Sequence, residues 1–448
     1  MLASRTWSTA GARLARSALA YVVVLSAIVT LAPLDFRVGQ PTAWSVLLLP
    51  GDFVRNVAFF IPLGFLAALA DGSRFALWRA PLAATLYSVA LEAAQRWLPG
   101  RFPSVADVAA NGFGAFIGAL LAVVLAGQVI HRQGMRAVGV LGAPLLGLLY
   151  LLTPLLWIGS LAGTQDGRLL VLVLAAIGGA VVMRAISLHQ MLHLDARGVP
   201  PAREHLGLAA LVAAWFLIGI APGDWSDGMG IAAATVAVAA IGAVPWLDRE
   251  RRLVAAQGGG RPRRERRFET RTLLQLAPLF ATYLVAQACW PLPDTIVEWR
   301  WANGFAPSAD ALDRAAILAV VERVAAFTVL GYGMAEWRSR ITETPSRMRW
   351  ASMAPVAAVA ALLEALRGAH PSFGANVWLF GASVVSAWVG VELFRTHRDF
   401  IVELLMQAAE VVDRARAMAI PALREEIPVP LGTGPVRALP SGRTDIAA

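Results

Sequence analysis

Apolar runs of about 20 residues recur along nearly the whole chain, and this recurrence constrains the fold more than any other feature. A run of that length can span the hydrocarbon core of a bilayer as a helix. Charged residues make up 15% of this chain, compared with about a quarter of a typical soluble domain. Lipid offers no hydrogen-bond partners, so each segment must satisfy its backbone internally, as a helix does. The sequence therefore predicts an all-α, polytopic membrane helix bundle.

About twelve segments are long and apolar enough to be transmembrane helices. The first follows Arg5, Arg13 and Arg16 as a signal peptide would, but its length favours an uncleaved span. Most arginines lie in alternate connections, and the positive-inside rule then places both termini in the cytoplasm of a bacterial inner (plasma) membrane protein. The predicted segments are 17–34, 53–70, 77–98, 105–126, 136–158, 169–188, 206–221, 229–247, 272–292, 315–336, 350–367 and 375–395.

A few polar residues interrupt the second, third and fourth segments, and all of them fall toward the same end. Ionisable groups at membrane depth are costly and usually functional. Under the predicted topology these residues converge at or just below the extracytoplasmic interface. Spacings of three and four residues place the members on the third and fourth segments on one face of each helix. The residues are Arg55, Asn56, Glu92, Gln95, Arg101, Asp107 and Asn111.

The residue types of this group suit the polar headgroup of a lipid. Arginine binds phosphate or carboxylate in a bidentate manner, while carboxylates and amides match sugar hydroxyls or a cationic amine. We therefore predict that the seven residues form a substrate-binding site. One alternative is a buried Arg–Glu–Asp network that only joins three helices, in which Ser104 caps a helix whose first turn contains Asp107. Paired carboxylates could also do acid/base chemistry, but no nucleophile is identifiable, so whether the protein is an enzyme stays open.

Three runs in this region, 56–64, 92–95 and 99–114, resemble the VanZ-like family in their order and spacing. That family is named for a glycopeptide (teicoplanin) resistance accessory protein, and the resemblance covers about the first quarter of the chain. The association with glycopeptide resistance points to the cell envelope. The resemblance and the polar group together predict recognition or handling of an envelope glycolipid, polyprenyl-linked saccharide or phospholipid at the extracytoplasmic leaflet.

The last four segments resemble the first four and predict two parallel four-helix repeats that flank a four-helix middle block. Chance similarity between Ala- and Leu-rich helices is the alternative. In the predicted register Glu364 and Arg323 correspond to Glu92 and Arg55, Asp107 is replaced by Ala375 or Asn376, and Asn111 by Leu379 or Phe380. The predicted organisation is a VanZ-like membrane domain at 1–131, the middle block at 132–250, a basic cytoplasmic linker at 251–271, the degenerate second repeat at 272–398, and a cytoplasmic amphipathic helix with a disordered tail at 399–448.

Two other functional classes are compatible with these features. Parallel repeats and buried charges also occur in secondary transporters, although there the polar residues lie near the midplane. A non-catalytic scaffold of an envelope-polysaccharide assembly would use the tail and the basic linker to bind protein partners. The expected partners are a membrane lipid or lipid-linked saccharide and envelope-assembly proteins, with no nucleic acid. No metal or cofactor is expected, because Cys289 lies alone in an apolar run and the pair His189 and His193 lies beside a basic loop.

Overall fold

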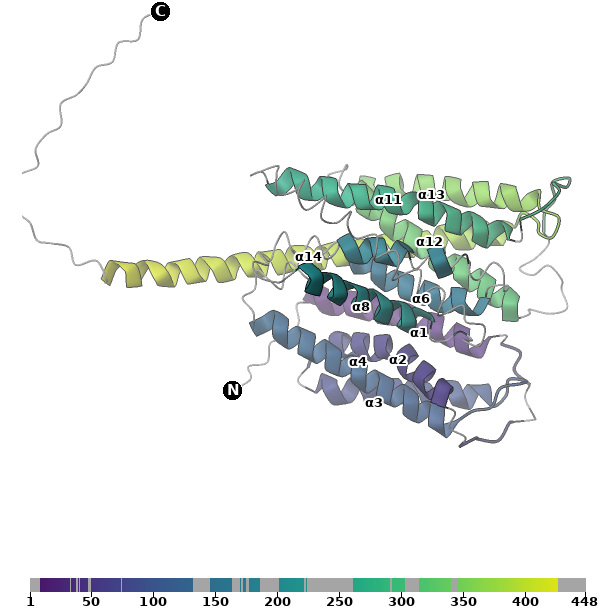
Figure 1. Ribbon diagram of the computed structural model, residues 1–448, viewed down its shortest axis with the longest axis horizontal. Helices are drawn as coiled ribbons and strands as arrows, with labels where there is room; N and C mark the ends of the chain where they lie inside the picture. The colour runs from purple at the N-terminus through teal and green to yellow at the C-terminus, as the bar shows by residue number, and fades with distance from the viewer. Residues whose placement is uncertain are drawn as a thin grey trace, which may run out of the picture. The chain divides into compact units, whose positions relative to one another are not determined.

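The computed structural model is all-helical, as the apolar runs predict. Its helices lie side by side with their axes roughly aligned within the unit that ends at Leu405 (Figure 1). The structure describes residues 9–32, 34–37, 39, 41–46, 50–73, 75–131, 146–162, 170, 172–174, 177–185, 201–220, 223, 261–290, 292–302, 314–339 and 345–425.

The four N-terminal helices correspond to the first four predicted segments. The second of them contacts the other three, so it is central to this unit. The helices are α1 (Thr9–Leu31), α2 (Pro50–Asp71), α3 (Ala76–Gln95) and α4 (Val105–His131).

Helices α2 and α4 approach each other with almost no side chain between their backbones. A Cβ atom on Gly64 would collide with the backbone of Ala115, and a Cβ atom on Gly118 would collide with the carbonyl of Ile61. Small residues allow this kind of close helix packing in membrane proteins. The contact sets the register of α2 against α4, and with it the relative depth of the polar residues on the two helices.

The middle block is described only in part. It contains α6 (Leu146–Ala162), a short apolar helix at Leu172–Ala185 and α8 (Pro201–Ile220), whereas the predicted segment 229–247 lies outside the described residues. Trp157 of α6 is fully buried, and the centre of its ring lies 4.6 Å from that of Phe59 on α2. The middle block is therefore packed against the N-terminal helices.

The last four helices correct two predicted boundaries. Residues 261–271 were predicted to be linker but begin α11, while 251–260 lie outside the described residues. The predicted last span and the amphipathic helix after it form one continuous helix, which includes Pro421 where the disordered tail was expected to begin. The helices are α11 (Arg261–Cys289), α12 (Arg314–Arg338), α13 (Pro345–Gly368) and α14 (Val377–Glu425).

Among the described residues, seven helices are long and apolar enough to cross a membrane, so the chain is a multi-pass membrane protein. The expectation of about twelve spans is not reached in this part of the chain. In the middle block, the apolar helical stretches Gly147–Leu161, Leu172–Ala185 and Ala210–Ile220 are shorter than the roughly 20 residues that a span needs. The seven candidates are Gly11–Leu31, Pro50–Asp71, Val105–Val124, Thr272–Cys289, Ala316–Arg338, Arg349–Gly368 and Val377–Glu403.

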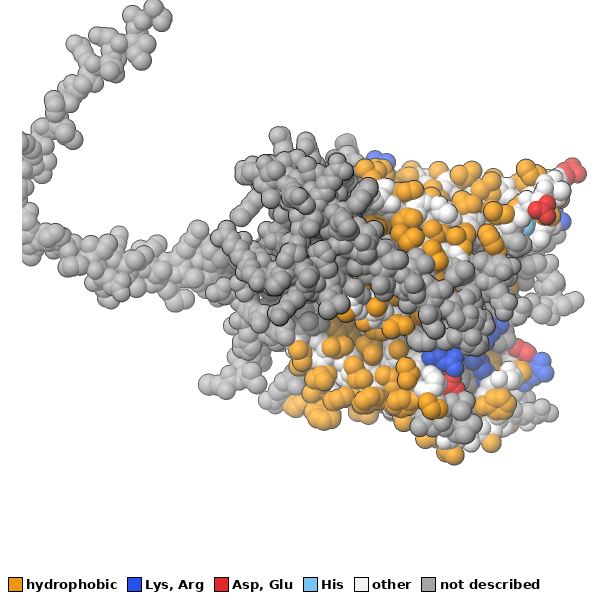
Figure 2. All heavy atoms as spheres, in the orientation of Figure 1, with side chains coloured by type: hydrophobic (Ala, Val, Ile, Leu, Met, Phe, Trp, Pro, Cys, Tyr) orange, Lys and Arg blue, Asp and Glu red, His pale blue; other side chains and the backbone are white. Residues whose placement is uncertain are grey.

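Helix α3 is not among the seven, but its two faces differ in a way that suits a membrane. Trp78, Leu82 and Leu86 follow one another at four-residue spacing and are 68%, 60% and 61% exposed. The opposite face buries Ser88 and Glu92 against the bundle. Figure 2 shows the same division on the visible face, where hydrophobic side chains cover the sides of the described helices and charged side chains gather at the right-hand end.

Candidate functional site

The connection between α1 and α2 is hydrogen-bonded to the connection between α3 and α4, with a parallel bridge between Ser45 and Ser104. The backbone N–H groups of Arg37, Thr42 and Ser45 donate to carbonyls of residues 96–103 over 2.7–2.8 Å. The N–H of Val105 donates back to the Ser45 carbonyl at 3.0 Å. These bonds hold the start of α4 in a defined position beside the end of α3.

Glu92 connects the two helices directly. Its side chain is 6% exposed, and its Oε2 accepts a hydrogen bond of 2.9 Å from the backbone N–H of Ser104. The Ser104 hydroxyl accepts in turn from the N–H of Asp107 at 3.3 Å, so the predicted helix cap is confirmed. Glu92 therefore lies under the first turn of α4. The carboxylate of Asp107 interacts electrostatically with the carboxylate of Glu92.

Asn111 lies one helical turn beyond Asp107 and faces α3. Its amide nitrogen donates to the hydroxyl of Ser88 at 2.8 Å, and Ser88 lies one turn before Glu92 on α3. The Asn111 side-chain oxygen is buried without a hydrogen-bond partner in the described structure. Asn56 of α2 completes the group, because its side-chain amide interacts with the Asp107 carboxylate. We call Asn56, Glu92, Asp107 and Asn111 the acceptor cluster, because each of these side chains carries at least one acceptor oxygen.

The remaining predicted residues surround the acceptor cluster without closing it. Arg55 pairs with Asp52 and also donates to the Gly223 carbonyl at 3.5 Å. Arg101 is close enough to act on the charge of Glu92, and burial together with the Arg314 guanidinium lowers the pKa of Arg101. The side-chain amide of Gln95 donates to the Thr30 carbonyl at 3.2 Å and so ties α3 to α1.

For the alternative of a buried Arg–Glu–Asp network that only joins three helices, the contacts at Glu92 and Asp107 are hydrogen bonds rather than ion pairs. Within the described part of the chain, no arginine forms an ion pair with Glu92 or Asp107. Ser88 was not among the residues predicted from the sequence, although its position four residues before Glu92 places it on the same helix face. The pairing of Asp52 with Arg55 was not predicted either.

A second cluster of the same construction joins α12, α13 and α14. Glu364 of α13 accepts a hydrogen bond of 2.8 Å from the N–H of Asn376, just before α14. The Asn376 side-chain oxygen accepts from the N–H of Leu379 at 3.1 Å. Here a guanidinium fills the centre, because Arg323 donates to Glu364 at 2.6 Å and to the Ser383 hydroxyl at 3.1 Å. Arg323 is 2% exposed, so this is a buried ion pair.

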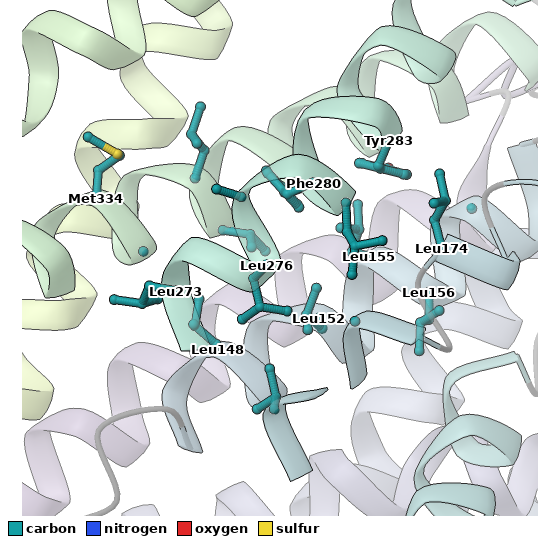
Figure 3. Close-up of a pocket in the computed structure, with 18 of the residues that line it drawn as sticks. Leu148, Leu152, Leu155, Leu156, Leu174, Leu273, Leu276, Phe280, Tyr283 and Met334 are labelled. Atoms are coloured by element: carbon teal, nitrogen blue, oxygen red, sulfur yellow. The ribbon is translucent and has the colours of Figure 1, made fainter. Parts of the chain in front are cut away.

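An apolar cavity of about 200 Å³ (Figure 3) has no residue of either cluster in its lining. Leucines of α6 and α11 point into it together with Phe280, Tyr283 and Met334. Such a lining suits hydrocarbon and offers no charge to a headgroup. As for metals, no group of three or more potential ligands occurs among the described residues, and His189 and His193 lie outside them.

The comparison with known families identifies the N-terminal unit. Residues 8–126 match the VanZ/LLP1 family. They form a VanZ/LLP1 domain. This domain comprises α1 to α3 and most of α4, and it contains all seven predicted site residues. No curated protein and no solved structure shows a significant match to the chain. The second cluster lies outside the matched residues, in the part of the chain that the family does not cover.

Proposed function

We propose that this VanZ-family membrane protein recognises or handles the polar headgroup of an envelope glycolipid, polyprenyl-linked saccharide or phospholipid at the extracytoplasmic leaflet. One observation carries the proposal: a cluster of two carboxylates and two amides, without an arginine ion pair in the described structure, lies at one end of helices whose sides are apolar. A lipid that lies alongside the helices presents its headgroup at that depth. Arg55 and Arg101 are the rim residues that can contact phosphate.

The proposed orientation places the acceptor cluster outside and both termini in the cytoplasm of the bacterial inner membrane. The distribution of arginine between alternate connections supports it. The position of the acceptor cluster near one end of its helices favours headgroup binding over a transporter, whose substrate site lies near the midplane.

We also infer that the two four-helix units are parallel copies of one ancestral unit. Both contain a glutamate that accepts from a backbone N–H 12 residues later, a cap at that residue, and two glycines at which the second and fourth helices touch. Both also contain a parallel bridge between the connections, at Ser45 with Ser104 and at Trp301 with Ala375. The matching pairs are Glu92 and Glu364, Ser104 and Asn376, Gly64 and Gly331, and Gly118 and Gly390.

These contacts favour a register that differs from the one expected from sequence. The earlier register paired Arg323 with Arg55 and replaced Asn111 by an apolar residue. In the register that the contacts favour, α12 is shifted by one residue in its alignment with α2. The connection before α14 is then aligned with the connection before α4 without a gap. The resulting pairs are Asn56 with Arg323, Asp107 with Leu379, and Asn111 with Ser383.

Lipid retention by the purified full-length protein tests the proposed function. We expect the wild-type protein to retain an envelope lipid that mass spectrometry detects, and the Glu92→Gln/Asp107→Asn double variant to lose it. Asp35→Asn is the matched control, because Asp35 lies in the connection between α1 and α2 and pairs only with the exposed Arg37 in the described structure. Equal lipid retention by a folded double variant would overturn the proposal.

A further inference from the structure

The two clusters differ in what occupies their centres. In the second cluster the Arg323 guanidinium lies between the Glu364 carboxylate and the Ser383 hydroxyl. In the first, Asn56 corresponds to this arginine in the register proposed above, and its neutral amide carries no positive charge. In the described part of the VanZ/LLP1 domain, no arginine forms an ion pair with Glu92 or Asp107, although Arg101 and Arg55 act on their charges from beyond ion-pair distance.

The acceptor cluster also carries more negative charge than its counterpart. Asp107 adds a second carboxylate beside Glu92, where the other unit has the apolar Leu379. In the proposed register Asn111 corresponds to Ser383, which receives the guanidinium. Asn111 is 6% exposed, and its side-chain oxygen is buried with no hydrogen-bond donor in the described structure. A buried acceptor without a donor is costly, and the cost is removed when a donor binds.

We propose that the acceptor cluster binds a ligand ammonium group, the cationic N–H donor of an amine-bearing headgroup, between Glu92, Asp107 and Asn111. Arg323 marks the equivalent position in the second unit, where the protein supplies the donor itself. The inference rests on the proposed headgroup function and names the chemical class of the headgroup. A primary ammonium offers three donors, which match two carboxylates and one amide oxygen. A quaternary ammonium offers none.

Binding measurements on the purified full-length protein test whether the acceptor cluster prefers a primary ammonium group. The probes are short-chain phosphatidylethanolamine, phosphatidylcholine, phosphatidylglycerol and free ethanolamine. We expect the first to bind about tenfold to a hundredfold more tightly than the second and third, which corresponds to the ~1.5–3 kcal/mol of a hydrogen bond to a charged group. Asp107→Asn should remove the preference, and Asp35→Asn should leave it intact.

The decisive variant is Asn56→Arg, which transfers the second unit's guanidinium to the first. We expect it to pair with Glu92, to abolish binding of the ammonium probe and to leave the melting temperature equal or higher. A folded Asn56→Arg protein that still prefers phosphatidylethanolamine overturns the inference. If Asn56→Arg does not fold, an Asp107→Asn protein that keeps the preference overturns it in the same way.

The probes separate this inference from the proposed function. Equal, Glu92-dependent binding of all three phospholipids supports headgroup recognition and overturns the ammonium inference. Binding of free ethanolamine without any phospholipid supports the ammonium site and overturns the lipid proposal. Binding of Mg²⁺ at Glu92 and Asp107, with no effect of either amine, overturns the ammonium inference, and binding of no probe overturns both.

Discussion

The Glu92 carboxylate on α3 accepts a hydrogen bond of 2.9 Å from the backbone N–H of Ser104, the residue that caps α4. Glu364 accepts in the same way from Asn376 at 2.8 Å. A bond from a backbone donor to a carboxylate is stronger than one between neutral groups. Each glutamate therefore joins two helix ends through one oxygen, while its other oxygen is available to a cation, as the Arg323 contact illustrates.

The first prediction concerns the structural part of this role. Glu92→Ala should lower the free energy of unfolding by ~1.5–3 kcal/mol, because the Ser104 N–H loses a charged acceptor in a buried position. Glu92→Gln should cost less, since an amide oxygen can still accept. Denaturation of the purified protein in detergent measures both, with Asp35→Ala as the exposed control. Equal losses for the two Glu92 variants would contradict the assigned hydrogen bond.

The second prediction concerns the close contact of α2 and α4. Gly118→Ala should destabilise the protein by ~1–3 kcal/mol, because the new methyl group meets the Ile61 carbonyl on the facing backbone. Gly51→Ala is the matched control in the first turn of α2, where a Cβ atom meets nothing within 4 Å. That change should be neutral or stabilising, as alanine favours helix over glycine. Similar melting temperatures for the two variants would argue against the contact.

The third prediction concerns the buried pair of Arg323 and Glu364. Either Arg323→Met or Glu364→Gln alone should cost ~3–5 kcal/mol, because each leaves an uncompensated buried partner. The double variant should cost less than the two single losses combined. A double-mutant cycle measures this coupling, and the exposed Arg37 and Asp35 pair should give only about 0–1 kcal/mol. Additive losses at Arg323 and Glu364 would show that the pair is not coupled.

The fourth prediction concerns orientation in the membrane. In a Cys289→Ala background, Gly100→Cys should react with a membrane-impermeant thiol reagent in intact cells. Gly260→Cys should be protected until the cells are lysed, because the basic stretch around it is expected in the cytoplasm. The reverse labelling pattern would invert the topology and remove the acceptor cluster from the outer leaflet.

Several features of the candidate site followed from spacing alone. Asp107 with Asn111, and Ser104 with Asp107, are separated by one helical turn, so their shared face and the helix cap were predictable. The partners across helices were not. Nothing in the sequence distinguishes Ser88 from other serines in apolar segments. Its role depends on α4, which places Asn111 against it. Gln95 shares a helix with Glu92, yet its amide reaches Thr30 on α1 instead.

From the sequence alone this chain could be predicted to be a helical multi-pass membrane protein with a VanZ/LLP1 domain, because lipid demands helices and the motif residues lie close together in the chain. Which charges are neutralised, in contrast, depends on how the helices pack. The sequence of an apolar segment does not indicate whether its arginine contacts a carboxylate. The α12 to α14 packing makes Arg323 the partner of Glu364, whereas Glu92 and Asp107 meet no arginine ion pair within the described residues. Pairing depends on the register of helices distant in sequence, which backbone contacts such as those of Gly64 and Gly331 determine.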